Sequence, residues 1–573
     1  MMRFRRLLIA VPVAALVFSA ALQSTQDQGV ASKTGMVVST SSIASDVGAA
    51  VLSKGGNAVD AAVATAFALA VTHPSAGNIG GGGFMVVRPV TGEPTTFDYR
   101  ERAPLASTPT MYLDSTGNIN RQLTARGYLA PGVPGTVRGM ELAHRKFGKL
   151  PWRDVVMPAV DLAEKGFAMP RGLASSLSGE VRGNMARFPA SAAAYGKPGG
   201  GDWVAGDTLR LKDLGRTLRA IAMGGADAFY SGWIADSIAA DMKANGGLIT
   251  KADLAAYQAR ERVPVRGTFR GYEIISMPPP SSGGVALIES LNMLENYDLK
   301  GQGRSSVETV HLLIEVRRRA FLDRARYLGD PDFVQIPLPR LLSKDYAKGL
   351  AQGISRSKAT SSVELGKDIV TVAQHEESDE TTQFSVIDKD GMAVSNTYTL
   401  EGGYGSHVVV KGAGFILNNE MGDFNKKPGE TNLSGDIGTP ANLIAPGKRM
   451  LSSMTPTIVA RDGKVVLVTG SPGGRTIINT VLDIVLNVTE FGMNVRAAVD
   501  APRMHHQWLP DRADIERGWV SAADSAKLVA MGHNVRAAGG QGDGHSIFVD
   551  PVTRVAYGAN DRRSSDSKVG IPK

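Results

Sequence analysis

Apolar residues recur at helical spacing near the start of the chain. After a break at residues 54–57, one face is formed by Val59, Val63, Phe67 and Val71. Residues four apart lie on the same side of an α-helix, so this spacing predicts a buried helix that ends at His73-Pro74. Four glycines at 80–83 then lead directly into an apolar, strand-like run, which indicates close backbone approach rather than a linker.

Strand-like patterns dominate the C-terminal third. Residues 381–387 and 392–400 are β-rich and flank Asp390-Gly391, a dipeptide typical of a hairpin turn. A second hairpin is predicted for residues 456–469 around Asp462-Gly463, and a helix is predicted after Gly473-Gly474. Because the strands come in hairpins, we expect a largely antiparallel sheet with helices packed over it.

Between these regions the pattern changes twice. Residues 112–350 are predicted to be mainly helical, with Pro/Gly breaks such as 277–284 and no internal repeat. Residues 355–380 are polar and irregular and end in an acidic cluster at 376–380. We expect this last segment to be exposed and mobile.

The first 24 residues have the pattern of a secretory signal peptide. Three arginines precede an apolar run at 7–22, and polar residues follow it. A membrane anchor is the alternative, but the run is shorter than the roughly 20 apolar residues that span a bilayer. We therefore predict a periplasmic or secreted protein with no membrane association after signal removal.

Composition excludes several classes of chemistry. The chain has 573 residues, 43% of them hydrophobic and 21% charged, which is typical of a globular enzyme. It has no cysteine, so a thiol nucleophile, a disulfide and a Cys-ligated zinc site are excluded. A net charge of +8 without a long basic run gives little support for nucleic-acid binding.

Familiar motifs for cofactors, metals and serine hydrolases are absent from the sequence. The pair His505-His506 could suggest a metal site, but consecutive side chains point in different directions, which favours a structural role. No cofactor and no metal are therefore expected.

Thr381 is the most informative residue, because it begins a strand directly after the acidic segment. A threonine hydroxyl is a weak nucleophile without a base. Scission before Thr381 would create an α-amine with a pKa of roughly 7.7 to 8, which is a suitable base. The alternative is an ordinary strand start, since Thr is common in strands.

Gly473-Gly474 lies between a predicted strand and a predicted helix. Backbone N–H groups at a helix N-terminus suit a developing oxyanion. The alternative here is a simple turn.

Together these features resemble the γ-glutamyltransferase family of the N-terminal nucleophile hydrolase superfamily. The resemblance extends from about Gly35 to Arg562. Its most specific segments are residues 55–62, 77–84, 99–104, 381–382, 417–421, 451–456 and 470–474.

The resemblance implies an α+β fold, a four-layer αββα sandwich of two antiparallel-rich sheets covered by helices. It also implies self-cleavage between Glu380 and Thr381, giving a large subunit at 25–380 and a small subunit at 381–573. The two remain one globular heterodimer. By similarity Thr381 is the nucleophile, Thr399 orients it, and the N–H groups of Gly473 and Gly474 form the oxyanion hole.

Substrate contacts also follow from the resemblance. The contacts with the α-carboxylate of a γ-glutamyl donor are assigned to Arg100, Ser452 and Ser453. Those with its α-amine are assigned to Glu420, Asp423 and Glu401. The implied donors are glutathione and other γ-glutamyl compounds, and the acyl group passes to water or to amino acids and peptides. The chemistry agrees, because a guanidinium pairs with carboxylates and acids pair with an ammonium.

Two positions depart from the family pattern. Glu401 stands where many members have Asn, and Ser434 stands where some have an aromatic residue in the lid-like loop 428–441. Two alternatives to the transferase stay open: a cephalosporin or glutaryl acylase of the same superfamily, and an uncleaved periplasmic amino-acid-binding relative.

Overall fold

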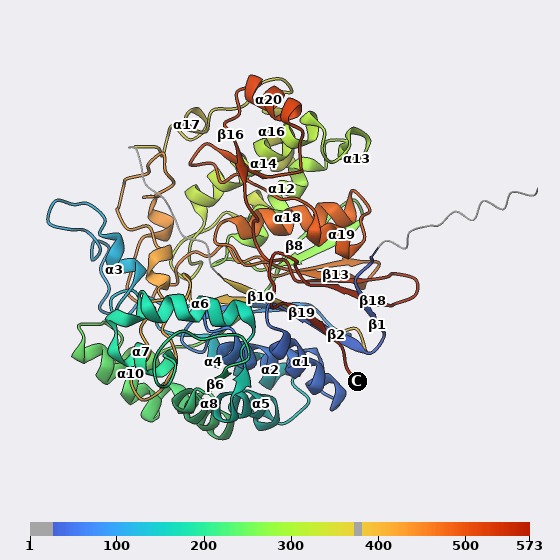
Figure 1. Ribbon diagram of the computed structural model, residues 1–573. Coiled ribbons are helices and arrows are strands. Elements are labelled where there is room, and N and C mark those ends of the chain that lie inside the picture. The colour runs from blue at the N-terminus through green and yellow to red at the C-terminus, as the bar shows by residue number, and fades with distance from the viewer. Residues whose placement is uncertain (1–26, 372–380) are drawn as a thin grey trace, which may run out of the picture.

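The computed structural model describes residues 27–371 and 381–573. The predicted signal peptide and the acidic cluster at 376–380 lie outside the described residues, as does the Glu380 side of the predicted cleavage bond. Figure 1 shows four layers: a lower helical layer, two stacked sheets and an upper helical layer. The αββα prediction is confirmed.

The first sheet has seven strands, and every neighbouring pair is antiparallel. In spatial order they are β19 (Lys568–Gly570), β2 (Gly35–Ser39), β10 (Thr382–Asp388), β11 (Ala393–Thr399), β3 (Gly82–Arg88), β4 (Thr95–Asp98) and β7 (Arg260–Arg262). The predicted hairpin around Asp390-Gly391 is β10–β11 at the centre of this sheet.

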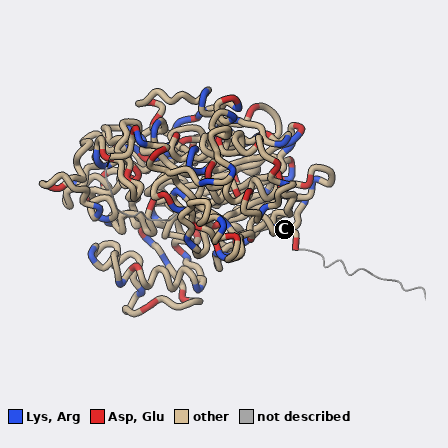
Figure 2. The backbone as a smooth tube through the Cα atoms, turned by 90° about the horizontal axis from the view of Figure 1, so that it is seen from above, with Lys and Arg blue, Asp and Glu red and all other residues tan. Residues whose placement is uncertain are grey.

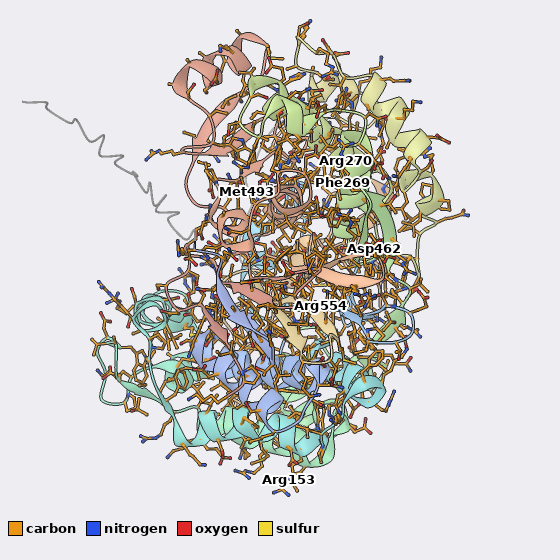
Figure 3. The ribbon with its side chains drawn as sticks, turned by 90° about the vertical axis from the view of Figure 1, so that its right-hand side faces the viewer. Arg153, Phe269, Arg270, Asp462, Met493 and Arg554 are labelled. Carbon is orange, nitrogen blue, oxygen red and sulfur yellow. The ribbon has the colours of Figure 1, made fainter. Side chains whose placement is uncertain are left out.

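The second sheet also has seven antiparallel strands. Their order is β1 (Val30–Ser32), β18 (Ala556–Ala559), β17 (Ser546–Val549), β13 (Lys464–Thr469), β12 (Thr457–Arg461), β9 (Tyr272–Ser276) and β8 (Val265–Phe269). The predicted second hairpin is β12–β13. Figure 3 shows its turn at Asp462 near Arg554, which reaches over from the β17–β18 turn and donates to the Val465 carbonyl at 3.2 Å.

Side chains alternate between the two faces of each strand, and this alternation builds the layers. In β2, Met36 and Val38 face the second sheet, whereas Val37 faces the helices below. The space between the sheets is filled from both by small clusters of β-branched residues, including Val86, Ile275, Ile458, Val468 and Ile547.

The first sheet is covered by α1 (Ser42–Ser53), α2 (Ala58–Thr72) and α4 (Thr136–Phe147), and beyond them α5 (Trp152–Lys165) packs against α2 and α8 (Lys212–Gly224) packs against α5. The predicted helix is α2, in which all residues are buried. It begins with a capping box: the Asn57 side chain accepts from the Val59 and Asp60 N–H groups, and the Asp60 carboxylate accepts from the Asn57 N–H.

The second sheet is covered by α12 (Gly283–Leu294), α14 (Val307–Tyr327), α18 (Thr476–Thr489) and α19 (Val495–Asp500). The remaining elements are α3 (Arg121–Ala125), β5 (Phe167–Ala168), α6 (Arg171–Arg182), η1 (Met185–Arg187), α7 (Pro189–Tyr195), β6 (Thr208–Leu209), α9 (Asp227–Tyr230), α10 (Trp233–Ala244), α11 (Lys251–Ala255), α13 (Leu299–Gln302), α15 (Leu338–Leu341), α16 (Lys344–Gln352), α17 (Ser362–Leu365), η2 (Glu420–Asp423), η3 (Pro440–Asn442), β14 (Met504–His505), β15 (Ala513–Glu516), α20 (Ala522–Ala530) and β16 (Val535–Ala538).

The structure differs from the sequence prediction in two segments. The mainly helical middle region also contributes β8 and β9, a hairpin that turns at Arg270-Gly271 with positive φ at both residues. The expected exposed segment is partly packed instead, because Ser362 of α17 is buried and its N–H donates to Asp511 at 2.9 Å.

Positively and negatively charged residues are interspersed over the described part of the chain (Figure 2). Along residues 27–371 and 381–573, no helix is both long and apolar enough to cross a bilayer.

Candidate active site

Thr381 stands at the head of β10, an interior strand of the first sheet next to the central β11, and is only 9% exposed. In the β10–β11 hairpin, Thr382 pairs with Tyr398. Continuing that register by one residue sets Thr399 opposite Thr381, and directly opposed residues have neighbouring side chains. The two threonines also line the same cavity.

The Thr399 hydroxyl has a defined orientation. Its oxygen accepts the N–H of Glu401 at 2.9 Å, so its proton remains for another acceptor. Glu401 adopts a left-handed φ of 81°, and its carboxylate accepts from the Asn419 amide. The turn after β11 therefore fixes Thr399 and Glu401 together.

Gly473 and Gly474 form the link between β13 and α18. The N–H and hydroxyl of Thr476 both donate to the Gly473 carbonyl, at 2.9 and 2.6 Å. In a trans peptide the N–H points opposite to the C=O, so the Gly474 N–H points away from the helix. A Cβ on Gly473 would lie 2.4 Å from the Thr476 hydroxyl, and φ is +128°, so glycine is required there.

One cavity joins most of the predicted site residues. Those that line it are Arg100, Thr381, Thr399, Glu401, Glu420, Asp423, Ser452, Ser453 and Gly474. Gly473 lines an adjoining cavity, which Thr381 also borders. All ten predicted site residues thus lie in or beside one hollow that contains Thr381.

Arg100 is fully buried and lies among three acids. Its Nη1 is 2.7 Å from Glu420 Oε2 and 3.6 Å from Glu101 Oε2, and its Nη2 donates to Asp423. Burial opposes the charged form of Arg100, but Glu420, Asp423 and Glu101 outweigh it and raise its pKa. The guanidinium therefore stays charged.

The acids outnumber this cation. Burial raises the pKa of Glu101 to about 8, and it also raises the pKa of Glu420, in both cases against the attraction of Arg100. Asp423 and Glu401 line the same cavity. Such a cluster favours a ligand that brings its own positive charge, such as an ammonium group.

Ser452 and Ser453 are held by a segment distant in sequence. The Ser452 N–H donates to the Pro280 carbonyl at 2.9 Å, and the Ser452 carbonyl accepts from the N–H and hydroxyl of Ser282, at 2.8 and 2.6 Å. The segment at 277–284, which the sequence marked only as a break between helices, therefore positions two site residues.

The model of the family described as Gamma-glutamyltranspeptidase matches residues 44–571. This chain belongs to the gamma-glutamyltranspeptidase family. It is accordingly an enzyme of that type, and the family prediction is confirmed.

Three matches define its neighbours. A glutathione hydrolase proenzyme of Escherichia coli K12 is 48% identical, covering 94% of this chain and 92% of the relative. The gamma-glutamyltranspeptidase structure from Helicobacter pylori is 47% identical with a TM-score of 0.55, covering 56% of this chain and 91% of that one. A cephalosporin acylase structure from Bacillus halodurans has a TM-score of 0.81 at 27% identity, covering 95% of this chain and 97% of that one.

These matches confirm the N-terminal nucleophile hydrolase fold. They also indicate that transpeptidases of this family are made as one precursor with a larger and a smaller part. The acylase is the more distant neighbour in sequence.

Several residues of this transpeptidase site were missed by sequence reasoning. Arg324, Asn425 and Asn442 line the cavity, and Asn419 binds Glu401. Their positions depend on contacts between distant segments, and no local motif marked them.

The lid-like loop reaches the cavity through Glu430, Asp436 and Ile437. Asp436 pairs with Arg121 of α3, which links the loop to a second surface element. The Ser434 N–H donates to the Asn432 side chain at 3.1 Å, so Ser434 takes part in the turn of the loop.

One group of buried residues in the described chain has metal-ligand composition: His311, Glu315 and His533. The His311 Nδ1 and His533 Nε2 are already 2.7 Å apart in a hydrogen bond. Glu315 accepts from Arg318, Arg319 and Thr360. These contacts form a buried polar network in the upper layer, in which His533 Nδ1 has no hydrogen-bond partner among the described residues. His505 and His506 are also buried, and His505 Nδ1 accepts from Asn479 at 2.6 Å.

Proposed function

We propose that this chain is a self-cleaving γ-glutamyltransferase with glutathione hydrolase activity. The observation that carries the proposal is the position of Thr381, which heads a central strand at a cavity shared with Arg100, Glu420 and Asp423. The name of the E. coli relative, glutathione hydrolase proenzyme, supports the same activity and the same precursor.

Self-cleavage begins with the hydroxyl of Thr381. Its oxygen attacks the carbonyl carbon of Glu380, the peptide C–N bond breaks, and the hydroxyl proton passes to the departing nitrogen. Water then hydrolyses the resulting ester, which releases the Glu380 carboxylate and restores the hydroxyl. The products are a large subunit of 25–380 and a small subunit of 381–573.

Catalysis uses the new terminus. The α-amine of Thr381 takes the proton from its own Oγ, which attacks the γ-carbonyl of the donor. The N–H groups of Gly473 and Gly474 stabilise the oxyanion, and the leaving amine takes up the proton. The γ-glutamyl ester on Thr381 then passes to water or to the amine of an amino acid or peptide.

Donor recognition follows from the charges around the cavity. Arg100 and the hydroxyls of Ser452 and Ser453 bind the α-carboxylate, and Glu420 and Asp423 bind the α-amine. In the structure Arg100 pairs with those two acids. A zwitterionic donor would exchange these ion pairs for equivalent ones, so the charge of the buried site stays balanced.

Glu401 adds a further acid to the amine side, where it lines the same cavity. We assign it to the α-amine as well. The predicted signal peptide at residues 1–24 supports a periplasmic or secreted enzyme.

The first test is the state of the purified protein. Denaturing electrophoresis and N-terminal sequencing are expected to give two chains, the smaller beginning with Thr381. A single intact chain that is nevertheless active would overturn the proposal.

The second test separates the transferase from an acylase. Turnover of γ-glutamyl-p-nitroanilide is expected, and glycylglycine should raise it by accepting the acyl group. A glutaryl analogue, which lacks the amine, should react poorly. Preference for the glutaryl compound would indicate the acylase, and binding without turnover would indicate an amino-acid-binding relative.

A further inference from the structure

Besides Arg100, the arginines Arg324 and Arg475 line the donor cavity. Arg324 belongs to α14, which covers the second sheet, and it lines the same cavity as Arg100 and Thr381. Its Nε donates to the Ser282 hydroxyl at 2.9 Å, and its Nη2 donates to the Ser453 hydroxyl at 3.1 Å. Arg324 is thereby held at two points, one of them a predicted donor contact.

The direction of the hydrogen bond determines what Ser453 can do. A guanidinium has donors and no acceptor, so the Ser453 oxygen must accept. The hydroxyl proton of Ser453 is then left to be donated elsewhere. Ser453 is 8% exposed and lines the cavity, so the available direction for that proton is toward a bound ligand.

Ser282 links Arg324 to the second serine as well. The Ser282 hydroxyl accepts from Arg324 and donates to the Ser452 carbonyl at 2.6 Å. One guanidinium thus stabilises the backbone of Ser452 and the side chain of Ser453. A hydroxyl that accepts from a cation is also a better donor, because the charge polarises it.

The charge of Arg324 completes the argument. Arg100 already faces Glu101, Glu420 and Asp423, all within 4 Å. A ligand carboxylate that approached Arg100 alone would enter a region rich in acids. Arg324 supplies a positive charge directly beside Ser453, where a carboxylate can be accommodated.

We propose that Arg324 is a specificity-determining residue, which orients the Ser453 hydroxyl toward the α-carboxylate of the γ-glutamyl donor. The inference rests on the proposed function, since it names a determinant of that same site. Arg324 acts through Ser453, so it is a positioning residue.

The test compares ligands that differ by one charged group. Wild-type enzyme and Arg324→Met are purified, and subunit formation is checked by electrophoresis. The KM for γ-glutamyl-p-nitroanilide is measured, followed by competitive inhibition with two amides. Glutaramate carries the carboxylate without the amine, and 4-aminobutyramide carries the amine without the carboxylate.

For Arg324→Met we expect the KM for γ-glutamyl-p-nitroanilide and the inhibition constant of glutaramate to rise about 10- to 100-fold, because hydrogen bonding to a charged group is lost. The inhibition constant of 4-aminobutyramide should stay within about twofold. Arg324→Lys keeps the charge and should fall between wild type and Arg324→Met. The matched control is Arg326→Met on the same helix, where Arg326 binds Asp368 instead, and it should behave like wild type.

An equal rise for both amides, or no rise for glutaramate, would overturn the inference. If Arg324→Met does not mature, Ser282→Ala removes one of the two anchors of Arg324 and should give a smaller rise with the same selectivity. A non-selective effect of Ser282→Ala would also overturn it. Failure of the proposed function is distinct, because wild-type enzyme would then not turn over γ-glutamyl-p-nitroanilide at all.

Discussion

Thr381 is almost completely buried and lines the cavity. Removal of its hydroxyl therefore leaves the outer surface of the protein unchanged. Thr381→Ala is expected to leave the full-length precursor uncut and to lower activity by on the order of 10⁴-fold or more, because nucleophile and base are lost together. Electrophoresis and intact mass measure the first effect, and p-nitroanilide release measures the second.

The matched control is Thr382→Val. The Thr382 hydroxyl is buried and has no hydrogen-bond partner among the described residues, so a nearly isosteric apolar side chain should fit. That variant should mature normally. Normal subunits from Thr381→Ala would contradict the mechanism.

Arg100 is the second residue whose role can be tested alone. Lysine cannot reproduce the two-pronged contact of Arg100 with Glu420 and Asp423. Arg100→Lys should therefore raise the donor KM by about 10- to 100-fold while subunit formation continues.

Arg102→Lys is a suitable comparison, because the Arg102 Nε donates to the Gly447 carbonyl outside the cavity. An unchanged KM in Arg100→Lys would remove Arg100 from the donor site.

Sequence reasoning reached the site residues unevenly. Thr381 and Gly473-Gly474 could be chosen from local chemistry, because each stands at a change of secondary structure. Arg100, Glu420 and Ser453 were assigned only through family resemblance. Arg324 could not be found by either route, since its contact with Ser453 joins residues 129 positions apart.

At the scale of elements, the glycine run at 80–83, which extends into β3, controls how closely β3 and β11 approach. Gly83 pairs with Tyr398, and a Cβ on Gly83 would lie 2.4 Å from the Tyr398 Cβ and 2.5 Å from the Thr397 carbonyl oxygen. Gly83→Ala should thus lower the free energy of unfolding by at least about 1–3 kcal/mol, as overpacking does. Thermal unfolding and the yield of mature subunits are the measurements.

Gly179→Ala in α6 gives the opposite expectation. A Cβ there would meet nothing within 4 Å, and alanine favours a helix over glycine by up to about 1 kcal/mol. If both variants lost the same amount of stability, close packing against β11 would not be the reason for a glycine at position 83.

Some elements could be predicted from local sequence alone, and others could not. Asp-Gly turns and regular apolar spacing marked β10–β11, β12–β13 and α2 directly. The β8–β9 hairpin was missed because its turn is Arg270-Gly271, which lacks the usual hairpin signature, and because its five-residue strands stand among helices. Its place is fixed by pairing with β12, almost two hundred residues away.

Across the whole molecule, buried histidines link stability to pH. Burial lowers the pKa of His505 to about 3 and that of His506 to about 4, from an ordinary value of 6.5. At a pH between the lowered pKa of the folded protein and the ordinary value of 6.5, the unfolded chain binds more protons than the folded one. The free energy of unfolding therefore falls as pH falls from 6.5 toward 4. Each unit of pKa shift corresponds to about 1.4 kcal/mol.

The variant His505→Gln isolates this contribution from that of the acids, whose raised pKa values act in the opposite direction above pH 4.5. The difference in unfolding temperature between wild type and variant should shrink between pH 6.5 and pH 4. A difference that is constant across this range would exclude His505 as a source of the dependence.

The strand order has a consequence for the molecule after the proposed scission at Thr381. In the first sheet β2, β3, β4 and β7 precede Thr381 in the chain, whereas β19, β10 and β11 follow it, and the two sets pair with each other at β19–β2, β2–β10 and β11–β3. In the second sheet the strands after Thr381 are contiguous and pair with the earlier strands at β1–β18 and β12–β9. Because strands of the two chains would be hydrogen-bonded to each other in both sheets, dilution would not separate the chains. Neither chain made alone would possess a complete sheet on which to fold.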